Sequence, residues 1–321
     1  MALQPCPPDA MKRISCIDIG TNTALLLIAD LDPKTGQIIP VCHKQTIIRL
    51  GKNVDEERQI GSEALHRLVS CMHDYGRISA EYSSATTIAV GTSALRDAKN
   101  RDAIIEAVAE ATNIKISCIS GHEEAELTFF GAIAGTNEIP DLFSVIDIGG
   151  GSTEISMGTP EKLTQSISLD IGSVRLTERH FTTLPPSPDE LLAAKETINA
   201  TLAAPTIPFL AARENVFGVA GTLTTIAQLS QGLRHFDAEK VHHYPLSYAE
   251  VRKLLEKLKT STLQEIVNMG IPEGRADVIT MGTLILLQIM RLLGIGEIRV
   301  SIQGLRFGLA QKELHRLQKN I

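Results

Sequence analysis

The tetrapeptide Ile17-Asp18-Ile19-Gly20 recurs later in the chain as Ile146-Asp147-Ile148-Gly149. Each copy closes an apolar run typical of a buried β-strand, and its glycine opens a short polar stretch typical of a turn. A second apolar run follows each turn, so the sequence predicts two strand–turn–strand units. One short match is weak support on its own, but two copies in the same predicted setting favour an internal duplication.

Outward from these two units, predicted strands alternate with predicted helices along most of the chain. After the first unit, apolar spacing predicts strands over residues 38–48, 86–90 and 114–119 and helices over residues 62–75, 103–111 and 123–135. After the second unit, it predicts strands over residues 217–220 and 298–302, a helix starting near Asp189, and helices over residues 251–258, 276–293 and 305–317. This alternation indicates an α/β fold.

The length and composition indicate a folded chain of two domains. It has 321 residues, of which 43% are apolar and 21% charged, as in ordinary globular proteins rather than disordered ones. The most apolar stretch, residues 278–290, is interrupted by Thr280, Gly282 and Gln288, which predicts a buried helix rather than a membrane span. The net charge of −6 argues against nucleic acid as a partner, because such binding depends on clustered Lys and Arg.

Other sequence signals narrow the class of protein further. The five cysteines form no C-x-x-C pair, so neither a zinc site nor a disulfide framework is indicated, and a reducing, cytoplasmic location is expected. Residues 1–9 contain three prolines and no continuous apolar run, so we expect a frayed tail there rather than a signal peptide. The chain has no G-x-x-x-x-G-K-[ST] stretch and no G-x-S-x-G stretch, which argues against a P-loop NTPase and an α/β-hydrolase.

Three consecutive glycines, Gly149, Gly150 and Gly151, suggest a phosphate loop. Because glycine has no Cβ, a phosphate approaches the backbone closely and accepts hydrogen bonds from its N–H groups. The hydroxyls of Ser152 and Thr153, which come next, add further donors. A plain β-hairpin turn is the alternative interpretation.

Two shorter stretches extend this interpretation. The turn Gly20-Thr21-Asn22-Thr23 is a weaker signal alone, but Asp18 leads into it as Asp147 leads into the glycines. The two turns are therefore interpreted as facing phosphate loops, and Gly221-Thr222, after another apolar run, as a third.

Carboxylates beside the loops suggest a metal ion. A bound polyphosphate needs its charge offset, and Mg²⁺ held by one or two carboxylates and phosphate oxygens is the usual means. Asp147 and Glu154 flank the glycines and are the predicted ligands, with Asp18 opposite them. The alternative for each is a carboxylate that caps a turn.

Three acids, Glu123, Glu124 and Glu126, fall near the start of a predicted helix. Favourable interaction with the helix dipole explains such acids without any function. A general base for the attack of water on phosphorus must be a carboxylate or imidazole within hydrogen-bond reach of that water. The pattern alone does not select one of the three.

Two arginines are candidate phosphate ligands, because a guanidinium binds phosphate with paired hydrogen bonds. Arg96 follows a predicted strand and the stretch Gly-Thr-Ser, and Arg275 precedes the apolar helix. The alternative for each is an ion pair, with Asp97 or Asp102 for Arg96 and with Asp277 for Arg275.

Four motifs occur in order along the chain, at residues 17–23, 91–96 (Gly-Thr-Ser-Ala-Leu-Arg), 120–125 (Ser-Gly-His-Glu-Glu-Ala) and 146–154. With this combination the chain resembles the exopolyphosphatase/guanosine pentaphosphate phosphohydrolase (Ppx/GppA) family of the actin–hexokinase superfamily, from about residue 14 to residue 309.

The resemblance implies an α/β fold of two ribonuclease-H-like (actin-like ATPase) domains with the active site in the cleft between them. We expect the first domain to span residues 1–121 and 305–321, with the C-terminal helix returning to it, and the second to span residues 122–304.

The resemblance also implies roles for individual residues. The catalytic base is the second Glu of the Ser-Gly-x-Glu-Glu-Ala motif, Glu124, and the metal ligands are Asp147 and Glu154. With the residues singled out above, the phosphate-binding set comprises Asp18, Gly20, Thr21, Asn22, Thr23, Thr92, Ser93, Arg96, Gly149, Gly150, Gly151, Ser152, Thr153, Gly221, Thr222 and Arg275.

The chain departs from the family pattern near its C-terminus. Where the family usually shows Gly-Leu-Arg-Glu-Gly, residues 304–308 read Gly-Leu-Arg-Phe-Gly, so no role is carried over for that acid. Longer members carry an additional helical region after the two domains. Its absence from this sequence favours a short-type enzyme of limited processivity.

We therefore predict an exopolyphosphatase that releases orthophosphate from inorganic polyphosphate by Mg²⁺-assisted attack of a water that Glu124 activates. The alternative is a guanosine pentaphosphate (pppGpp) 5′-phosphohydrolase, and a phosphotransferase or a non-catalytic guanosine polyphosphate sensor is less favoured. Another divalent cation, stimulation by K⁺ and a homodimer are left open. No nucleic acid or membrane partner is expected.

Overall fold

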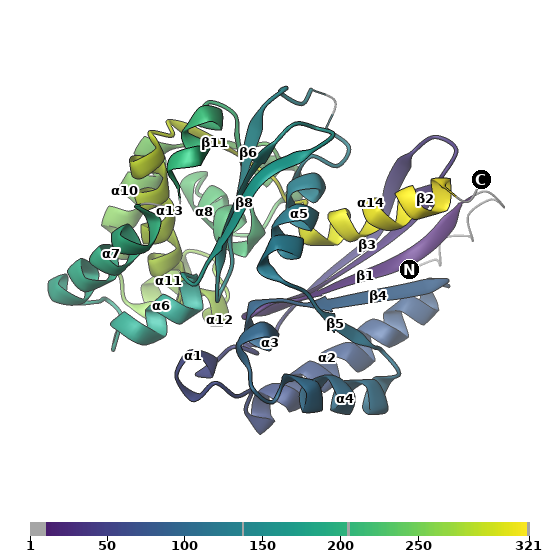
Figure 1. The fold of residues 1–321 in the computed structure, drawn as a ribbon. Coiled ribbons are helices and arrows are strands. Elements are labelled where there is room, and N and C mark those ends of the chain that lie inside the picture. The colour runs from purple at the N-terminus through teal and green to yellow at the C-terminus, as the bar shows by residue number, and fades with distance from the viewer. Residues whose placement is uncertain (1–10, 137, 204–205, 320–321) are drawn as a thin grey trace. The chain divides into compact units, whose positions relative to one another are not determined.

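The computed structural model describes residues 11–136, 138–203 and 206–319, and the chain divides into two compact units (Figure 1). The first unit comprises Met1–Asn137 with Leu305–Ile321, and the second comprises Glu138–Gly304. Both contain a mixed sheet with helices, which confirms the predicted α/β fold. The tail expected over residues 1–9 lies outside the described residues.

The first unit has a five-stranded sheet in the order β3-β2-β1-β4-β5. Strand β2 is antiparallel to both β1 and β3, whereas β4 and β5 run parallel to β1. Its strands are β1 (Lys12–Ile19), β2 (Thr23–Asp32), β3 (Gln37–Ile47), β4 (Thr86–Gly91) and β5 (Ile116–Cys118). Its helices are α1 (Val54–Glu57), α2 (Ser62–Glu81), α3 (Ser93–Asp97), α4 (Arg101–Thr112), α5 (Gly121–Ala132) and α14 (Leu305–Gln318).

The second unit has a six-stranded sheet in the order β10-β11-β9-β6-β7-β8. Its strands are β6 (Phe143–Ile148), β7 (Thr153–Gly158), β8 (Leu163–Leu169), β9 (Val216–Val219), β10 (Pro245–Ser247) and β11 (Glu297–Val300). Across this sheet, the strands β8-β7-β6-β9-β11 have the same order and relative directions as β3-β2-β1-β4-β5 of the first sheet. Strand β10 is an additional antiparallel strand at the edge, next to β11. The shared topology supports the duplication that the repeated tetrapeptide suggests.

Helices fill both faces of the first sheet because residues along β1 alternate between two apolar clusters. Ile17 and Ile19 pack with α2 and α4 on one face, whereas Ile14 and Cys16 pack with α5 and α14 on the other. Figure 1 shows the two pairs of helices on opposite sides of the strands. Asp18 shares the face of Cys16, so its side chain lies on the side of α5 and α14.

Helices α5 and α14 pack closely together within the first unit. A Cβ at Gly308 would overlap the carbonyl oxygen of Leu127, so the two helix backbones touch where that glycine lies. The division therefore falls after residue 137, whereas the sequence places residues 122–137 in the second domain. The difference arises because α5 buries its apolar side against α14, a helix that begins about 180 residues later in the chain.

The core of the second unit is built around α13 (Ile279–Leu293). The stretch Glu273–Leu293 is long and apolar enough to cross a membrane, but 83% of its most apolar window is buried inside the structure, as in the core helix of a soluble protein. The predicted buried helix is thus confirmed. The other helices are α6 (Ser173–His180), α7 (Pro188–Leu202), η1 (Ile207–Ala212), α8 (Ala220–Ser230), α9 (Ala238–Val241), α10 (Tyr248–Leu258), α11 (Leu263–Asn268) and α12 (Glu273–Ala276).

Candidate active site

The two turns that follow the repeated tetrapeptides have the same shape. The Gly20 N–H donates to the Thr23 carbonyl at 3.0 Å, and the Gly149 N–H donates to the Ser152 carbonyl at 3.0 Å. A Cβ at either glycine would lie 3.2 Å from that same carbonyl oxygen. The duplication therefore extends from the strands to the turns that the sequence singles out as phosphate loops.

The glycine loop, residues 149–152, is fixed by the first turn of α6. The Ser173 N–H donates to the Gly149 carbonyl at 3.0 Å, and the Val174 N–H donates to the Gly150 carbonyl at 2.8 Å. A Cβ at Gly172 would overlap the Gly150 carbonyl, so the backbone of α6 reaches the loop only because that residue is glycine. The carbonyls of the loop thus face α6.

The carbonyl orientation fixes where the N–H groups of the loop point. In a planar trans peptide the N–H is directed opposite to the C=O, and none of these peptides is cis. The N–H groups of Gly150, Gly151 and Ser152 are therefore directed away from α6. Successive N–H groups on one side of a turn form an anion-binding concavity, which favours a phosphate loop over a plain hairpin turn.

The first unit has an equivalent arrangement. The Gly51 N–H donates to the Thr21 carbonyl at 2.8 Å, and the Ile48 N–H donates to the Asn22 carbonyl at 3.0 Å. The segment after β3 thus holds this turn as the segment after β8 holds the glycine loop. By the same peptide geometry, the N–H groups of Asn22 and Thr23 point away from the segment that holds them.

The hydroxyls of the two loops differ in what they bind. Thr153 Oγ1 donates to the Ile171 carbonyl at 2.7 Å, and the side chain is fully buried, so it does not serve as the phosphate donor that the sequence predicts. Among the described residues, the buried Thr21 Oγ1 has no hydrogen-bond partner. Ser152, at the end of the glycine loop, is buried as well.

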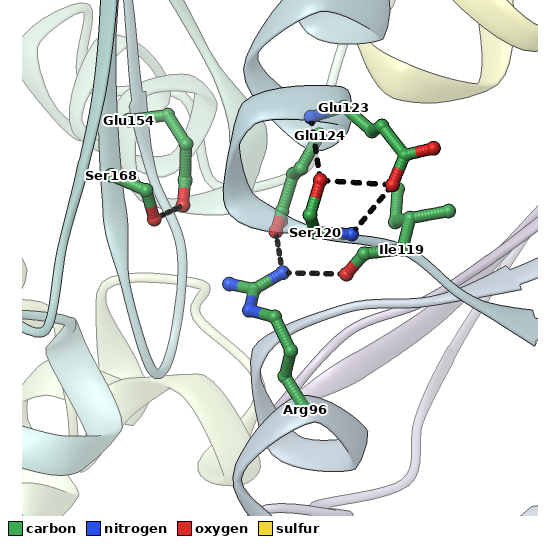
Figure 2. Close-up of polar contacts among 7 residues, drawn as sticks. All are labelled: Arg96, Ile119, Ser120, Glu123, Glu124, Glu154 and Ser168. Carbon is green, nitrogen blue, oxygen red and sulfur yellow. Dashed lines mark hydrogen bonds and ion pairs between the residues drawn. The ribbon is translucent and has the colours of Figure 1, made fainter.

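Asp147 on β6 and Glu154 on β7 are paired across the two strands. Directly opposed antiparallel residues have their Cβ atoms about 5 Å apart and share one face of the sheet. Ser168, on the next strand, donates to Glu154 Oε1 at 2.6 Å, which orients that carboxylate (Figure 2). Two oxygen donors of this kind suit a hard divalent cation that also binds phosphate oxygens. The described part of the chain contains no group of three or more acids, histidines or cysteines that could hold a metal ion.

The structure separates the three acids at the start of α5. Glu123 completes a capping box, in which its Oε2 accepts the Ser120 N–H at 2.9 Å, and Glu126 is exposed. Glu124 alone among the three is buried. Helix geometry therefore directs one acid inward, and it is the residue that the family resemblance identifies as the base.

Glu124 is bound to Arg96 of α3 (Figure 2). Arg96 Nη1 donates to Glu124 Oε2 at 2.6 Å and to the Ile119 carbonyl at 3.2 Å. Burial raises the pKa of Glu124, whereas the Arg96 charge and the Thr92 hydroxyl stabilise its ionised form. Arg96 thus forms an ion pair with Glu124, a partner that its position in the sequence did not suggest.

Asp18 lies at the end of β1, near Glu124. Burial and the Glu124 charge raise its pKa to about 7, and the charge of Arg306 opposes this effect. Arg306, at the start of α14, donates from Nη1 to the Leu26 carbonyl at 3.3 Å. The sequence analysis noted Arg306 only within residues 304–308, the segment that departs from the family pattern. Its place beside Asp18 was missed because it depends on the packing of α14.

The start of α3 lies against the end of β1. The Thr92 N–H donates to the Ile19 carbonyl at 3.1 Å, and Thr92 and Ser93 are both buried. The structure thus brings Asp18, Thr92, Arg96 and Glu124 together within the first unit.

The third glycine stretch and Arg275 meet in the second unit. A Cβ at Gly221 would lie 2.7 Å from Arg275 Nη2, so the guanidinium packs directly on that glycine. Arg275 Nη1 also donates to Thr225 Oγ1 at 3.2 Å, and burial lowers its pKa to about 10. Thr222 is buried at the start of α8. Arg275 therefore stabilises the first turn of α8.

Comparisons with known proteins identify relatives of this chain. A sequence profile of the Ppx/GppA phosphatase family matches residues 27–317. The chain is 34% identical over 315 residues to Exopolyphosphatase 2 of Mycobacterium tuberculosis, covering 94% of this chain and 98% of that protein. It is 28% identical over 310 residues to the guanosine-5′-triphosphate,3′-diphosphate pyrophosphatase of Pseudoalteromonas atlantica, covering 95% and 59%.

The crystal structure of an exopolyphosphatase-like protein, 28% identical in sequence, superposes with a TM-score of 0.91 and covers 96% of this chain and 99% of that one. The family match over residues 27–317 spans both units and includes the last three of the four motifs, whereas the first, residues 17–23, precedes it. The fold and the resemblance that the sequence indicated are therefore confirmed. The chain belongs to the Ppx/GppA phosphatase family.

Proposed function

We propose that the protein is an exopolyphosphatase, which hydrolyses the terminal phosphoanhydride bond of inorganic polyphosphate and releases orthophosphate. The observation that carries the hydrolytic assignment is Glu124, a buried carboxylate bound to Arg96 at 2.6 Å. A carboxylate held in this way has a fixed direction, as a general base requires. A protein that only binds phosphate has no need of such a group.

Glu124 acts on the attacking water. Its ionised carboxylate accepts a proton from the water as the oxygen attacks the terminal phosphorus and the bond to the bridging oxygen breaks. Arg96 keeps the carboxylate ionised in spite of its burial. The products are orthophosphate and a chain shorter by one phosphate.

The loops bind the phosphate oxygens. The N–H groups of Gly150, Gly151 and Ser152 stabilise charge on the phosphate during transfer, because such preorganised donors need no reorganisation at that moment. Asp18, whose pKa lies near 7, carries a proton in part of the molecules at neutral pH and then donates a hydrogen bond to phosphate.

Asp147 and Glu154 are the proposed ligands of Mg²⁺. Their opposed carboxylates fit a hard cation, and the ion, when bound, neutralises charge on the phosphate chain. The family is one of phosphatases, which supports a divalent cation. Stimulation by K⁺ is carried over from the resemblance alone.

The relatives support two substrates. Exopolyphosphatase 2, at 34% identity over nearly the full length of both chains, supports inorganic polyphosphate. The guanosine-5′-triphosphate,3′-diphosphate pyrophosphatase, at 28%, supports pppGpp as the alternative. Both substrates end in a phosphoanhydride, so the same loops and base serve either one. A cytoplasmic location, a homodimer and the absence of nucleic acid and membrane partners belong to the same proposal.

The test compares orthophosphate release from polyphosphate and from pppGpp by one enzyme preparation with Mg²⁺ and no acceptor. Glu124→Gln should lower kcat by about 10²–10⁴-fold and leave KM nearly unchanged. Glu126→Gln, an exposed acid on the same helix, is the matched control and should keep wild-type kcat. Near-wild-type turnover by Glu124→Gln would remove the base assignment, and turnover only with a nucleotide acceptor would identify a phosphotransferase.

A further inference from the structure

We infer that Arg175 is a positioning residue for the glycine loop: its side chain fixes the Gly151–Ser152 peptide so that the Ser152 N–H faces the phosphate. The inference rests on the proposed function for its catalytic consequence. Arg175 is only 5% exposed and lies in the first turn of α6. Neither its sequence position nor the family motifs quoted above gave it a role.

Arg175 binds two successive carbonyls of the loop. Its backbone N–H donates to the Gly150 carbonyl at 3.0 Å, and its Nε donates to the Gly151 carbonyl at 2.6 Å. The short distance is typical of a hydrogen bond from a charged donor, which is stronger than a neutral one. One residue therefore holds the last two peptide planes of the glycine loop.

The side chain is needed because the backbone of α6 does not reach the whole loop. Backbone N–H groups of α6 hold the carbonyls of Gly149 and Gly150, whereas the Gly151 carbonyl is held by Arg175 Nε. Glycine has the greatest backbone freedom of any residue, so a peptide next to it rotates easily when unrestrained. Without the Nε donor, the Ser152 N–H would lose its fixed direction.

Substitutions at this position separate the donor from the charge. Counted from Cβ, the Nε2 of glutamine occupies the place of the arginine Nε, so Arg175→Gln keeps a donor there and removes the charge. Arg175→Met has a carbon at that place and keeps neither. Arg179 lies one turn later on the same helix and is exposed, so Arg179→Met is the matched control.

Steady-state hydrolysis of polyphosphate is the first measurement. Arg175→Met should lower kcat/KM by about 10- to 100-fold, somewhat less than the loss on removing an oxyanion donor itself. Arg175→Gln should stay within about threefold of the wild type, and so should Arg179→Met. Equal losses in Arg175→Gln and Arg175→Met would overturn the inference, because they would show that charge or packing matters rather than the donor.

A titration with orthophosphate gives a readout that does not depend on turnover. In protein labelled with ¹⁵N-glycine and ¹⁵N-serine, the amide signals of Gly150, Gly151 and Ser152 should shift on titration, and the Ser152 shift should be lost in Arg175→Met. An unchanged Ser152 response in that variant would overturn the inference.

The two measurements keep the hypotheses apart. A wild-type enzyme that hydrolyses neither polyphosphate nor pppGpp would refute the proposed function, and the titration would still decide the role of Arg175. If Arg175→Met fails to fold by circular dichroism, Arg175→Gln decides: a loss above about tenfold in kcat/KM would overturn the inference, and retention supports it.

Discussion

Asp147 and Glu154 stand opposite each other on antiparallel strands, whereas the equivalent pair in the first unit is Asp18 and Leu25. The two units therefore share a topology but differ in chemistry at one register position. Opposed like charges destabilise a sheet unless a cation lies near them. The duplicated fold thus carries a potential cation site in the second unit, and the buried base in the first.

Removal of one carboxylate of this pair should abolish the response to Mg²⁺. Wild-type protein should unfold at a higher temperature with millimolar Mg²⁺ than with EDTA, because a ligand that binds only the folded state stabilises it. Asp147→Asn should show no such increase and should unfold slightly above the wild type in EDTA, since the repulsion is gone. Thermal unfolding by circular dichroism measures both effects. Glu161→Gln, an exposed acid after β7, is the control, and a full Mg²⁺ response in Asp147→Asn would contradict the metal assignment.

Loss of Arg96 should shift the pH dependence of catalysis. Arg96 opposes the effect of burial on the pKa of Glu124, so Arg96→Met should raise that pKa further and move the acid limb of the kcat/KM profile to higher pH. Because a buried charge loses its partner, the free energy of unfolding should also fall by about 3–5 kcal/mol. Profiles from pH 5.5 to 9 measure the shift. Arg101→Met, an exposed arginine nearby in sequence, should leave the profile unchanged, and an unshifted limb in Arg96→Met would contradict the coupling.

The pKa of Asp18 predicts how stability depends on pH. The folded protein holds this proton up to about pH 7, whereas the unfolded chain releases it near 3.8. The raised pKa of Asp18 therefore makes the free energy of unfolding fall as pH rises from about 4 to 7, by at most about 4 kcal/mol. Asp18→Asn should be more stable than the wild type at pH 8 and similar to it near pH 4. Urea unfolding of both proteins across this range tests the sign, and a difference that does not grow with pH would contradict it.

Gly308→Ala should disturb the base through helix packing. The added Cβ would overlap the Leu127 carbonyl of α5, so the helices must separate, at a cost of about 1–3 kcal/mol. Because α5 also carries Glu124, kcat should fall as well. Gly296→Ala, where a Cβ meets nothing within 4 Å, is the control for both measurements. Wild-type stability and kcat in Gly308→Ala would show that the two helices adjust freely.

The strands next to the site were predictable because their signals are local. The apolar run closed by Gly-Thr predicted residues 86–90 as a strand, and β4 spans Thr86–Gly91. Helix α2 was predicted only as far as residue 75, yet it continues to Glu81 through Gly76. A Cβ at Gly76 would lie 3.4 Å from Ile114 Cδ1, an ordinary contact distance, so this glycine is a helical position that faces Ile114 and does not end the helix.

The site was predictable in its residue types but not in its contacts. The sequence could not choose among the acids at the start of α5, because only the capping box fixes which one turns inward. The sequence analysis assigned Thr153 to phosphate because the hydrogen bond of its hydroxyl to the Ile171 carbonyl is formed by tertiary packing, which the local sequence does not reveal. Arg175 and Arg306 were assigned no role. Arg175 binds a carbonyl 24 residues earlier and Arg306 binds one 280 residues earlier, so neither contact leaves a local signal in the sequence.

The return of α14 to the first unit affects the order in which the protein is made. Ile14, Cys16 and Leu27 of the first sheet are covered by a helix that begins at Leu305. Domains fold as units during synthesis, usually from the N-terminus. Here the second unit, Glu138–Gly304, emerges from the ribosome whole, while the first still lacks one of its apolar layers and Arg306. The half of the molecule that is translated first is the last to be completed, so a growing chain carries Glu124 long before that residue has its finished surroundings.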